Sequence, residues 1–397
     1  MLKQKIKKLA KQYYEDVVEI RRHLHQNPEL SYQETATGQF IASKLKKYRI
    51  DHEHGMAENG VVALIKGKNP EKRVLALRAD IDALPIQETN EVPYRSQKQG
   101  IMHACGHDAH TASLLGTARI LNNIRKDFEG TIKLIFQPAE EKLPGGASIM
   151  IKEGVLQNPV PGRILGQHVH PPLEKGKVGF CAGKYMASAD ELYMTVKGRG
   201  GHGALPNTCI DPIAITAQIL VSLQQIVSRY APPTIPSVLT FGKIQSSGGA
   251  TNVIPNEVKL EGTFRTMDES WRKKAHKRMR KMAKSIAKSM GGACELEIAK
   301  GYPVLYNDQQ TTLEAKQLAV KYLGEENVVD LPIRMTAEDF AYYSHKIPAC
   351  FYRLGTGNKQ KGITSSVHTS TFNIDEESLE VGMGLMAWLA VNASSST

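Results

Sequence analysis

The spacing of hydrophobic positions predicts alternating helices and strands over the first 183 residues. Helical spacing occurs in three stretches, at residues 4–26, 31–47 and 111–122. Short apolar runs of strand length occur in four places, at residues 60–66, 73–78, 131–136 and 164–168. A further helix is expected to begin at Gly145–Ala147. Strands that alternate with helices are typical of an α/β domain built on a largely parallel sheet.

The pattern changes near Gly183 and then reads strand, helix, strand, strand, helix, strand. These six elements are expected at residues 191–197, 211–229, 237–244, 257–265, 269–290 and 294–299. Their order is that of a ferredoxin-like α+β unit. Beyond them, alternation of strands and helices resumes and continues to a final helix. We therefore expect an α/β domain formed by residues 1–183 and 300–397, with an inserted domain at residues 184–299.

The composition is that of an ordinary globular protein. The chain has 397 residues, with 41% hydrophobic and 23% charged residues, and it is long enough for more than one domain. No apolar run approaches membrane-spanning length, so no membrane partner is expected. The five cysteines are odd in number and scattered, at Cys105, Cys181, Cys209, Cys294 and Cys350. That usage predicts a reducing, cytoplasmic location. The last residues, 394–397, are expected to be disordered.

The formal net charge of +11 comes largely from two segments, residues 3–11 and 272–288. In the second segment, Ala275, Met279 and Ile286 recur at helical spacing, so the lysines are expected on the opposite, solvated face. Binding of nucleic acid is the alternative interpretation of this charge. No aromatic or glycine-rich recognition motif accompanies it, and we predict no nucleic-acid partner.

The stretch 101–111 contains the densest candidate chemistry. Cys105 and His107 flank a single glycine, so a tight backbone there would turn a thiolate and an imidazole toward one point. These are the ligands that a borderline divalent metal prefers. The alternative is a buried free cysteine beside surface histidines.

Further candidates follow predicted strands, which is where α/β proteins place functional groups. They are Asp80, Asp82, Glu140, Glu141 and His168, the last at the expected end of its strand. Adjacent buried carboxylates repel each other unless a cation is present. A metal would relieve that repulsion if one glutamate binds it while the other exchanges a proton with water. The alternatives are a solvated turn, exposed glutamates and a structural histidine.

Six short motifs then occur in order along the chain. They are Arg78-Ala79-Asp80 with Asp82-Ala83-Leu84-Pro85, His103-Ala104-Cys105-Gly106-His107-Asp108, Phe136-Gln137-Pro138-Ala139-Glu140-Glu141, Gly201-His202, Asn252-Val253-Ile254-Pro255 and Glu338-Asp339-Phe340. Together with Arg21–Leu30, they resemble the M20 metallopeptidase family, and most closely its amidohydrolases, such as aminoacylase, hippurate hydrolase and auxin-conjugate hydrolase. The resemblance covers nearly the whole chain. It implies a zinc-peptidase-like α/β catalytic domain with an inserted ferredoxin-like lid or dimerisation domain.

The resemblance also implies roles for individual residues. Two divalent metal ions per subunit (zinc, manganese, cobalt or nickel) would be held by Cys105, His107, Glu141, His168 and His368, with Cys105 as the bridge. Glu140 would be the general base. Asp80 and Asp82 would orient the ligands.

Three residues of the inserted domain would complete the site in a homodimer or tetramer formed through that domain. His202 would come from the lid of a partner subunit and stabilise the developing oxyanion. Asn252 and Arg265 would hold the α-carboxylate of the substrate, to which a guanidinium is well suited.

The expected reaction is metal-dependent hydrolysis of an N-acyl-L-amino acid to a carboxylic acid and a free amino acid. A dipeptidase or an N-acetyldiaminopimelate deacetylase would use the same site. A non-catalytic binding protein on the same fold and a hydrolase with Cys105 as nucleophile are alternatives of other classes. Two differences from many relatives, Lys142-Leu143-Pro144 after the paired glutamates and Asn207 in place of a histidine, are expected to reshape the acyl pocket.

Overall fold

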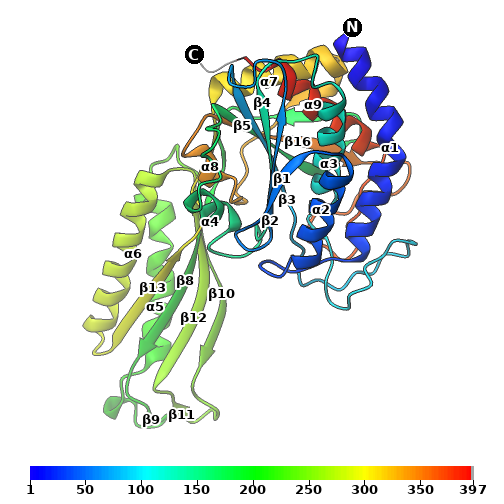
Figure 1. The fold of residues 1–397 in the computed structure, drawn as a ribbon. Coiled ribbons are helices and arrows are strands. Elements are labelled where there is room, and N and C mark those ends of the chain that lie inside the picture. Colours follow the sequence, from blue (N-terminus) through cyan, green and yellow to red (C-terminus); the bar gives the residue numbers. More distant parts are fainter. Residues whose placement is uncertain (395–397) are drawn as a thin grey trace. The chain divides into compact units, whose positions relative to one another are not determined.

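The computed structural model describes residues 1–394, so most of the tail expected to be disordered lies outside the described residues. The chain forms two compact units (Figure 1). Unit 1 contains Met1–Gly183, Tyr306–Pro332 and the chain from Asp339 onward, and unit 2 contains Lys184–Leu305 and Ile333–Glu338. Within the described part of the chain, no helix is long and apolar enough to span a membrane.

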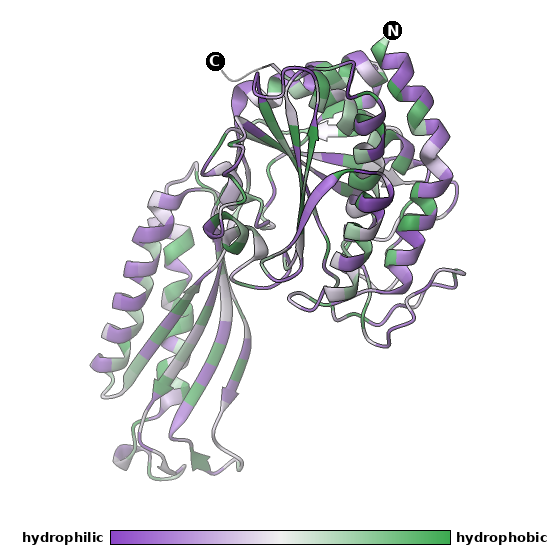
Figure 2. Ribbon diagram, viewed as in Figure 1, coloured by the Kyte–Doolittle hydropathy of each residue, from purple (hydrophilic) through white to green (hydrophobic). Residues whose placement is uncertain are grey.

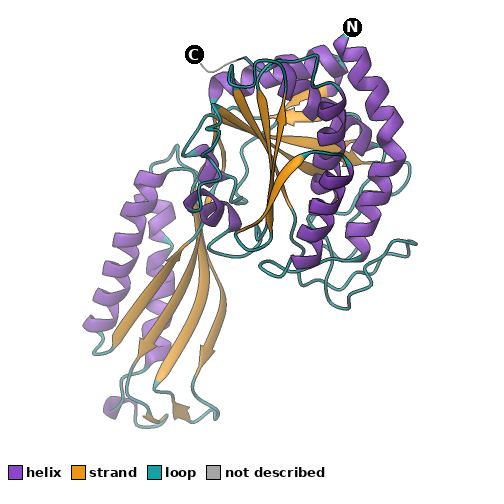
Figure 3. Ribbon diagram, in the orientation of Figure 1, coloured by secondary structure: helices purple, strands orange, loops and turns teal. Residues whose placement is uncertain are grey.

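Unit 1 is built on a mixed sheet of eight strands in the order β1-β2-β4-β3-β5-β16-β6-β15 (Figures 1 and 3). The strands are β1 (Asp51–Met56), β2 (Gly60–Lys66), β3 (Val74–Asp80), β4 (Thr131–Gln137), β5 (Arg163–Glu174), β6 (Val178–Phe180), β15 (Val328–Asp330) and β16 (Ala349–Gly357). The four central strands, β4, β3, β5 and β16, all run parallel to one another. Their carboxyl ends therefore meet at one edge of the sheet, and this edge carries the site.

Helices cover the sheet of unit 1. They are α1 (Leu2–Gln26), α2 (Thr35–Lys47), α3 (His107–Asn123), α4 (Gly146–Lys152), α7 (Gln309–Leu323), α8 (Ala341–Ser344) and α9 (Ser378–Asn392), with a short 3₁₀ turn at Glu325–Asn327. Helices α1, α3 and α9 pack against one another. Almost every residue of α3 is buried, whereas α1 alternates hydrophobic and hydrophilic positions (Figure 2). Helix α3 is thus held inside the core, and its first residue is His107.

Unit 2 has the ferredoxin-like arrangement. Its four-stranded antiparallel sheet has the order β10-β12-β8-β13, with two helices, and a separate two-stranded ribbon pairs β11 with β9. The elements are β8 (Ser188–Lys197), β9 (Gly201–His202), α5 (Pro212–Leu223), β10 (Ser237–Ser246), β11 (Val253–Ile254), β12 (Glu257–Thr266), α6 (Glu269–Ser289) and β13 (Ala293–Lys300), with a 3₁₀ turn at Pro206–Thr208. Strands β7 (Gly183–Met186) and β14 (Leu305–Asn307) lie where the chain passes between units.

The basic helix α6 has the predicted amphipathic character. Ala275 and Met279 are buried, and the lysines of the helix are exposed, which Figure 2 shows as a mainly hydrophilic ribbon. Arg272 is an exception to the expected solvated face. It is fully buried, and its guanidinium donates two hydrogen bonds to Asp190, at 2.5 and 2.9 Å. One cation of the segment therefore belongs to the core of unit 2.

Two of the predicted elements end at clearly different residues from those expected. The strand that was expected to end at His168 continues to Glu174, because its parallel pairing with β16 runs on past that residue. The helix expected at residues 211–229 ends at Leu223 and is followed by a π-helical turn at Ile226–Tyr230. The hydrophobic run of β5 ends before its hydrogen-bonded pairing does, whereas that of α5 continues into the π-helical turn, so neither end could be read from the pattern.

Candidate metal centre

Histidine, cysteine and carboxylate side chains converge at the carboxyl edge of the central strands in unit 1. Among the described residues, five groups of three side chains have ligand atoms that all lie within 4.8 Å of one another. Two of these groups share Cys105: Cys105 with His107 and His168, and Cys105 with Glu141 and His368. These two sets contain all five residues expected to bind metal, and Cys105 belongs to both. The arrangement offers two adjacent positions for cations that share one sulfur ligand.

Gly106 makes the turn that brings Cys105 and His107 together. It is the residue before helix α3 and has a φ of +84°, a conformation that side chains disfavour. A Cβ atom at this position would also come within 2.6 Å of Val169. Only glycine fits both the backbone conformation and the space, so the spacing of the two ligands depends on it.

His168 is held with one ring nitrogen toward Cys105. Its Nδ1 is 2.7 Å from the carbonyl oxygen of Val169, and its Nε2 is 3.4 Å from the Cys105 sulfur. The N–H of Val169 in turn donates to Nε2 of His110, at 2.9 Å. The carbonyl contact places the proton of a neutral His168 on Nδ1, which leaves Nε2 as a metal-binding lone pair.

Asp82 orients two of the candidate ligands. Its carboxylate is 3.0 Å from Nδ1 of His107 and accepts hydrogen bonds from the N–H of Glu141 at 2.9 Å and the hydroxyl of Ser31 at 2.6 Å. Nε2 of His107 lies 3.9 Å from a Glu141 carboxylate oxygen and 3.7 Å from Asp80. Asp82 thus fixes the imidazole and the glutamate backbone in the way that a carboxylate behind a metal ligand does.

The site fits a divalent cation. Nε2 of His107 is buried and has no hydrogen-bond partner among the described residues, which is unusual for a buried polar atom. Burial opposes the charged form of this ring, yet the Asp80 carboxylate and the Cys105 sulfur raise the pKa of His107 well above its ordinary value. The Cys105 and Glu141 contacts likewise raise the pKa of His368 to about 10. Both pKa values are raised by acidic side chains close to the rings, and a cation between these groups would be favoured by the same surroundings.

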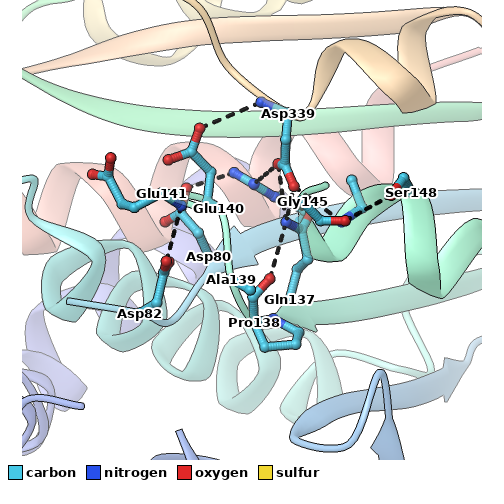
Figure 4. A network of polar contacts seen from close by, with 12 residues as sticks. Asp80, Asp82, Gln137, Pro138, Ala139, Glu140, Glu141, Gly145, Ser148 and Asp339 are labelled. Carbon is cyan, nitrogen blue, oxygen red and sulfur yellow. Dashed lines mark hydrogen bonds and ion pairs between the residues drawn. The ribbon is translucent and has the colours of Figure 1, made fainter. Parts of the chain in front are cut away.

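Glu140 lies beside the candidate ligands in the turn after β4. Its side chain is buried, and one carboxylate oxygen accepts a hydrogen bond from the N–H of Asp339 at 3.3 Å (Figure 4). Ala139, the residue before it, has a φ of +53° and donates its N–H to Glu34 at 2.7 Å. The turn therefore holds the two glutamates in fixed, separate directions, as Figure 4 shows.

His368 reaches the same edge from the long segment after β16. Its N–H donates to the carbonyl of Ala104 at 2.7 Å, and its Nε2 lies 3.3 Å from Glu141. With 51% of its side chain exposed, it is the most solvent-accessible of the five candidate ligands.

The three site residues expected from the inserted domain lie in unit 2. His202 in β9 is directly opposite Val253 in β11, so this ribbon brings His202 and Asn252 together. Arg265 lies near the other end of the sheet, opposite Ala189, and donates a hydrogen bond to the Met335 carbonyl at 3.3 Å. Glu257 and Arg265 are eight positions apart on strand β12, which corresponds to about 26 Å. Within one chain, Arg265 is therefore not brought together with the other two.

Comparison with known proteins identifies the family. Residues 76–392 match the model of peptidase family M20/M25/M40. The chain belongs to this family. It is 44% identical to an N-acyl-L-amino acid amidohydrolase of Geobacillus stearothermophilus, over 78% of this chain and 83% of the relative. It is 38% identical to thermostable carboxypeptidase 2 of Saccharolobus solfataricus, over 99% of both chains.

Among solved structures, a dinuclear metal binding peptidase of the M20 family from Bacillus subtilis is similar over 96% of this chain and 98% of that one. The TM-score is 0.82 and the sequence identity 37%. The family confirms the α/β catalytic domain with an additional lid domain. It also confirms that the protein is a metal-dependent amidohydrolase, and the alternative of a non-catalytic binding protein is thereby rejected.

Sequence reasoning did not assign roles to several residues that support the site. Glu34 holds the turn before Glu140, and His110 bonds to Asp80 at 2.5 Å as well as to Val169. The spacing of His107 and His110 on one helix could have indicated that both face the same side. Glu34 precedes a helix like an ordinary polar residue, and no local pattern distinguishes it.

Proposed function

We propose that this amidohydrolase cleaves N-acyl-L-amino acids to a carboxylic acid and a free amino acid, with two divalent metal ions in each subunit. The observation that carries the proposal is the pair of ligand sets that share Cys105, with a separate buried glutamate beside them. The amidohydrolase relative from Geobacillus stearothermophilus supports the substrate class, and the dinuclear peptidase from Bacillus subtilis supports the number of metal ions.

Cys105, His107, Glu141, His168 and His368 are the residues that would hold the ions. When bound, such ions lower the pKa of water and polarise an amide carbonyl. Zinc, manganese, cobalt and nickel all suit a mixed set of thiolate, imidazole and carboxylate ligands, and availability decides among them.

Glu140 would move the proton. It takes a proton from the attacking water at a carboxylate oxygen and passes it to the nitrogen of the leaving amine. Because Glu141 belongs to a ligand set that shares Cys105 and Glu140 does not, Glu140 is the carboxylate that would change its protonation state during turnover. The fixed turn between them keeps these two roles separate.

His202 would donate a hydrogen bond to the oxyanion. The N–H of Ala204 donates to Nδ1 of His202 at 3.1 Å, so the neutral ring carries its own proton on Nε2. Nε2 is then a donor, as an oxyanion requires. The side chain is exposed in unit 2, and we propose that it serves the site of a partner subunit in a homodimer or tetramer.

Asn252 and Arg265 would bind the α-carboxylate of the substrate. Asn252 lies beyond the Glu257 end of β12, whereas Arg265 is about 26 Å along the strand from Glu257, so the two cannot hold the same small carboxylate from one subunit. We propose that Asn252 acts beside His202 in the partner's site, and that Arg265 acts in the site of its own chain.

Cleavage of peptides is the second candidate function. The carboxypeptidase relative from Saccharolobus solfataricus matches nearly the full length of both chains. The two reactions share the attacking group and the base, and they differ only in what occupies the acyl side of the bond.

A hydrolysis screen tests the proposal. N-acetyl and N-benzoyl amino acids and dipeptides would be offered to protein that has been stripped of metal and reloaded separately with zinc, manganese, cobalt or nickel. We expect the N-acyl amino acids to be cleaved with the highest kcat/KM and no turnover without metal. Preference for dipeptides over every N-acyl amino acid would replace the first function by the second.

A further inference from the structure

Asp339 is a fully buried carboxylate outside the two ligand sets that share Cys105. It forms a separate cluster with Glu140 and Glu338, whose carboxylate oxygens lie within 4.8 Å of one another. Its side chain accepts hydrogen bonds from Arg78 at 2.7 Å and from the Gln137 amide at 2.7 and 2.9 Å. It also accepts one from the N–H of Ala147 at 3.0 Å. These donors come from β3, β4 and α4, so three elements of unit 1 fix one side chain.

The backbone of the same residue contacts the proposed base. The N–H of Asp339 donates to a carboxylate oxygen of Glu140 at 3.3 Å, and Figure 4 shows this contact beside the side-chain network. Asp339 is also where the chain re-enters unit 1 after Ile333–Glu338. A backbone donor at such a junction keeps its direction only if something anchors it, and the buried side chain supplies that anchor.

We propose that Asp339 is a positioning residue for Glu140. Its anchored side chain fixes the backbone N–H that holds the Glu140 carboxylate in the orientation needed for proton transfer. This inference rests on the proposed role of Glu140 as the base. It adds a residue that acts through Glu140 and touches neither substrate nor metal.

The donor geometry explains why a carboxylate is needed. Arg78 is itself held by a second carboxylate, Asp80 at 2.6 Å, and by the Gln137 side-chain oxygen at 2.9 Å, so its guanidinium cannot turn away. An asparagine at position 339 would place an N–H₂ group among these donors. One donor would lose its acceptor and the segment would shift, and a displacement of about 1 Å at a catalytic group can reduce the rate about 10²-fold.

A purely structural role predicts a different result. A buried carboxylate that only stabilises the fold should behave like Asp375, which is 2% exposed in unit 1 and accepts a hydrogen bond from Asn358 at 2.5 Å. Asp375→Asn is therefore the matched control. A positioning role lowers kcat, whereas a structural role lowers the unfolding temperature alone.

The experiment compares Asp339→Asn, Gln137→Met and Asp375→Asn in the full chain, with metal content, unfolding temperature, kcat and KM measured for each. For Asp339→Asn we expect kcat to fall about 10- to 100-fold, with KM within about threefold and metal content unchanged. Gln137→Met removes two hydrogen bonds to Asp339 and one acceptor of Arg78, but it leaves the ion pair between Arg78 and Asp339, so it should lower kcat by a smaller factor. Asp375→Asn should keep the kcat of the parent.

A double variant tests whether Asp339 acts through the base. Residues that work as a unit have non-additive effects, so Asp339→Asn should not lower the residual rate of Glu140→Gln further. A full additional loss in that background would overturn the inference, as would a kcat of Asp339→Asn within twofold of the parent. If Asp339→Asn does not fold, an unchanged kcat for Gln137→Met overturns it instead. An active Glu140→Gln would refute the base assignment itself, which is a distinct outcome.

Discussion

The candidate residues of unit 1 and those of unit 2 differ in how they are held. In unit 1, Cys105, His107 and Glu140 are buried, and hydrogen bonds from other elements fix their surroundings. In unit 2, His202 and Asn252 are exposed on a short ribbon, where the N–H of Gly203 bonds to the Asn252 carbonyl at 2.7 Å. The candidate residues of unit 1 are thus surrounded by their own unit, whereas the side chains on the ribbon of unit 2 face solvent.

This difference indicates a division of labour. Buried groups held by several partners can be preorganised for metal binding and proton transfer, because little reorganisation is needed when the reaction occurs. Exposed groups gain such precision only when another surface excludes water around them. The comparison therefore predicts large, self-contained effects from changes in unit 1 and effects in unit 2 that depend on assembly.

Loss of the thiol proposed to bridge the two ions should have the largest effect. We expect Cys105→Ala to weaken metal binding and abolish turnover, because alanine offers no soft, charged donor. Chelation should inactivate the parent reversibly. Cys350→Ala is the control, since Cys350 is also a fully buried free cysteine but belongs to neither ligand set. Metal content, measured by mass spectrometry, and the hydrolysis rate of each variant test this prediction. Full activity after exhaustive chelation would support a cysteine nucleophile instead.

Removal of the proposed base should have the next largest effect. Glu140→Gln should keep its metal and lose about 10²–10⁴ in kcat, the usual range for general acid–base catalysis. The expected signature is a divergence between metal content and rate. A variant that stays within tenfold of the parent, about 1.4 kcal/mol in activation free energy, would contradict the assignment.

His202→Ala tests the exposed half of the comparison. Removal of an oxyanion donor typically costs about 10²–10³ in turnover, and we expect that loss with unchanged metal content. Mixing this variant with Glu140→Gln should restore part of the activity, because a mixed dimer has one site with both groups intact. His54→Ala, at another exposed histidine, should be nearly neutral. No recovery after verified subunit exchange would place the His202 action within its own chain.

Periodicity predicted most of the fold because burial imposes it. Strand β2 was predicted at its observed bounds, and β4 to within one residue, since both are buried hydrophobic runs. Strand β1 was missed because Asp51–Met56 is largely polar and exposed, and it pairs through its backbone with β2. A pattern of side chains contains little information about a strand that is held by main-chain hydrogen bonds.

The candidate ligands were accessible from the sequence because the chemistry of cysteine, histidine and paired glutamates is distinctive. The residues that hold these ligands by hydrogen bonds were harder to predict from the sequence. Asp82 could be placed near the candidate ligands by its motif, but its hydrogen bonds to Ser31 and Glu141 join segments 51 and 59 residues away. Asp339 reaches Arg78 across 261 residues. Such contacts depend on how the chain folds back on itself, which local spacing does not encode.

The smallest expected effect concerns the support of the catalytic turn. Glu34 is fully buried, and burial together with the nearby Asp82 raises its pKa to about 7. The folded state therefore binds this proton more tightly than the unfolded state does, so stability is highest below about pH 4.5 and falls as the pH rises to about 7. At about 1.4 kcal/mol per pKa unit, the full change is about 3 kcal/mol.

Glu34→Gln should remove this slope, because glutamine cannot ionise but can still accept the hydrogen bond from Ala139. Glu88→Gln is the control of opposite sign. Burial alone would raise the pKa of Glu88, but the contacts with His25 have the larger effect and lower it. The stability that the ionised Glu88 contributes is therefore lost as the pH falls. Denaturant unfolding from about pH 3 to 8, with chelator in every sample to remove metal linkage, covers the pH window of Glu34 above pH 4.5 and that of Glu88 below it. A constant difference in unfolding free energy between parent and Glu34→Gln across that range would show that Glu34 does not titrate there, and that the buried support of the turn is indifferent to pH.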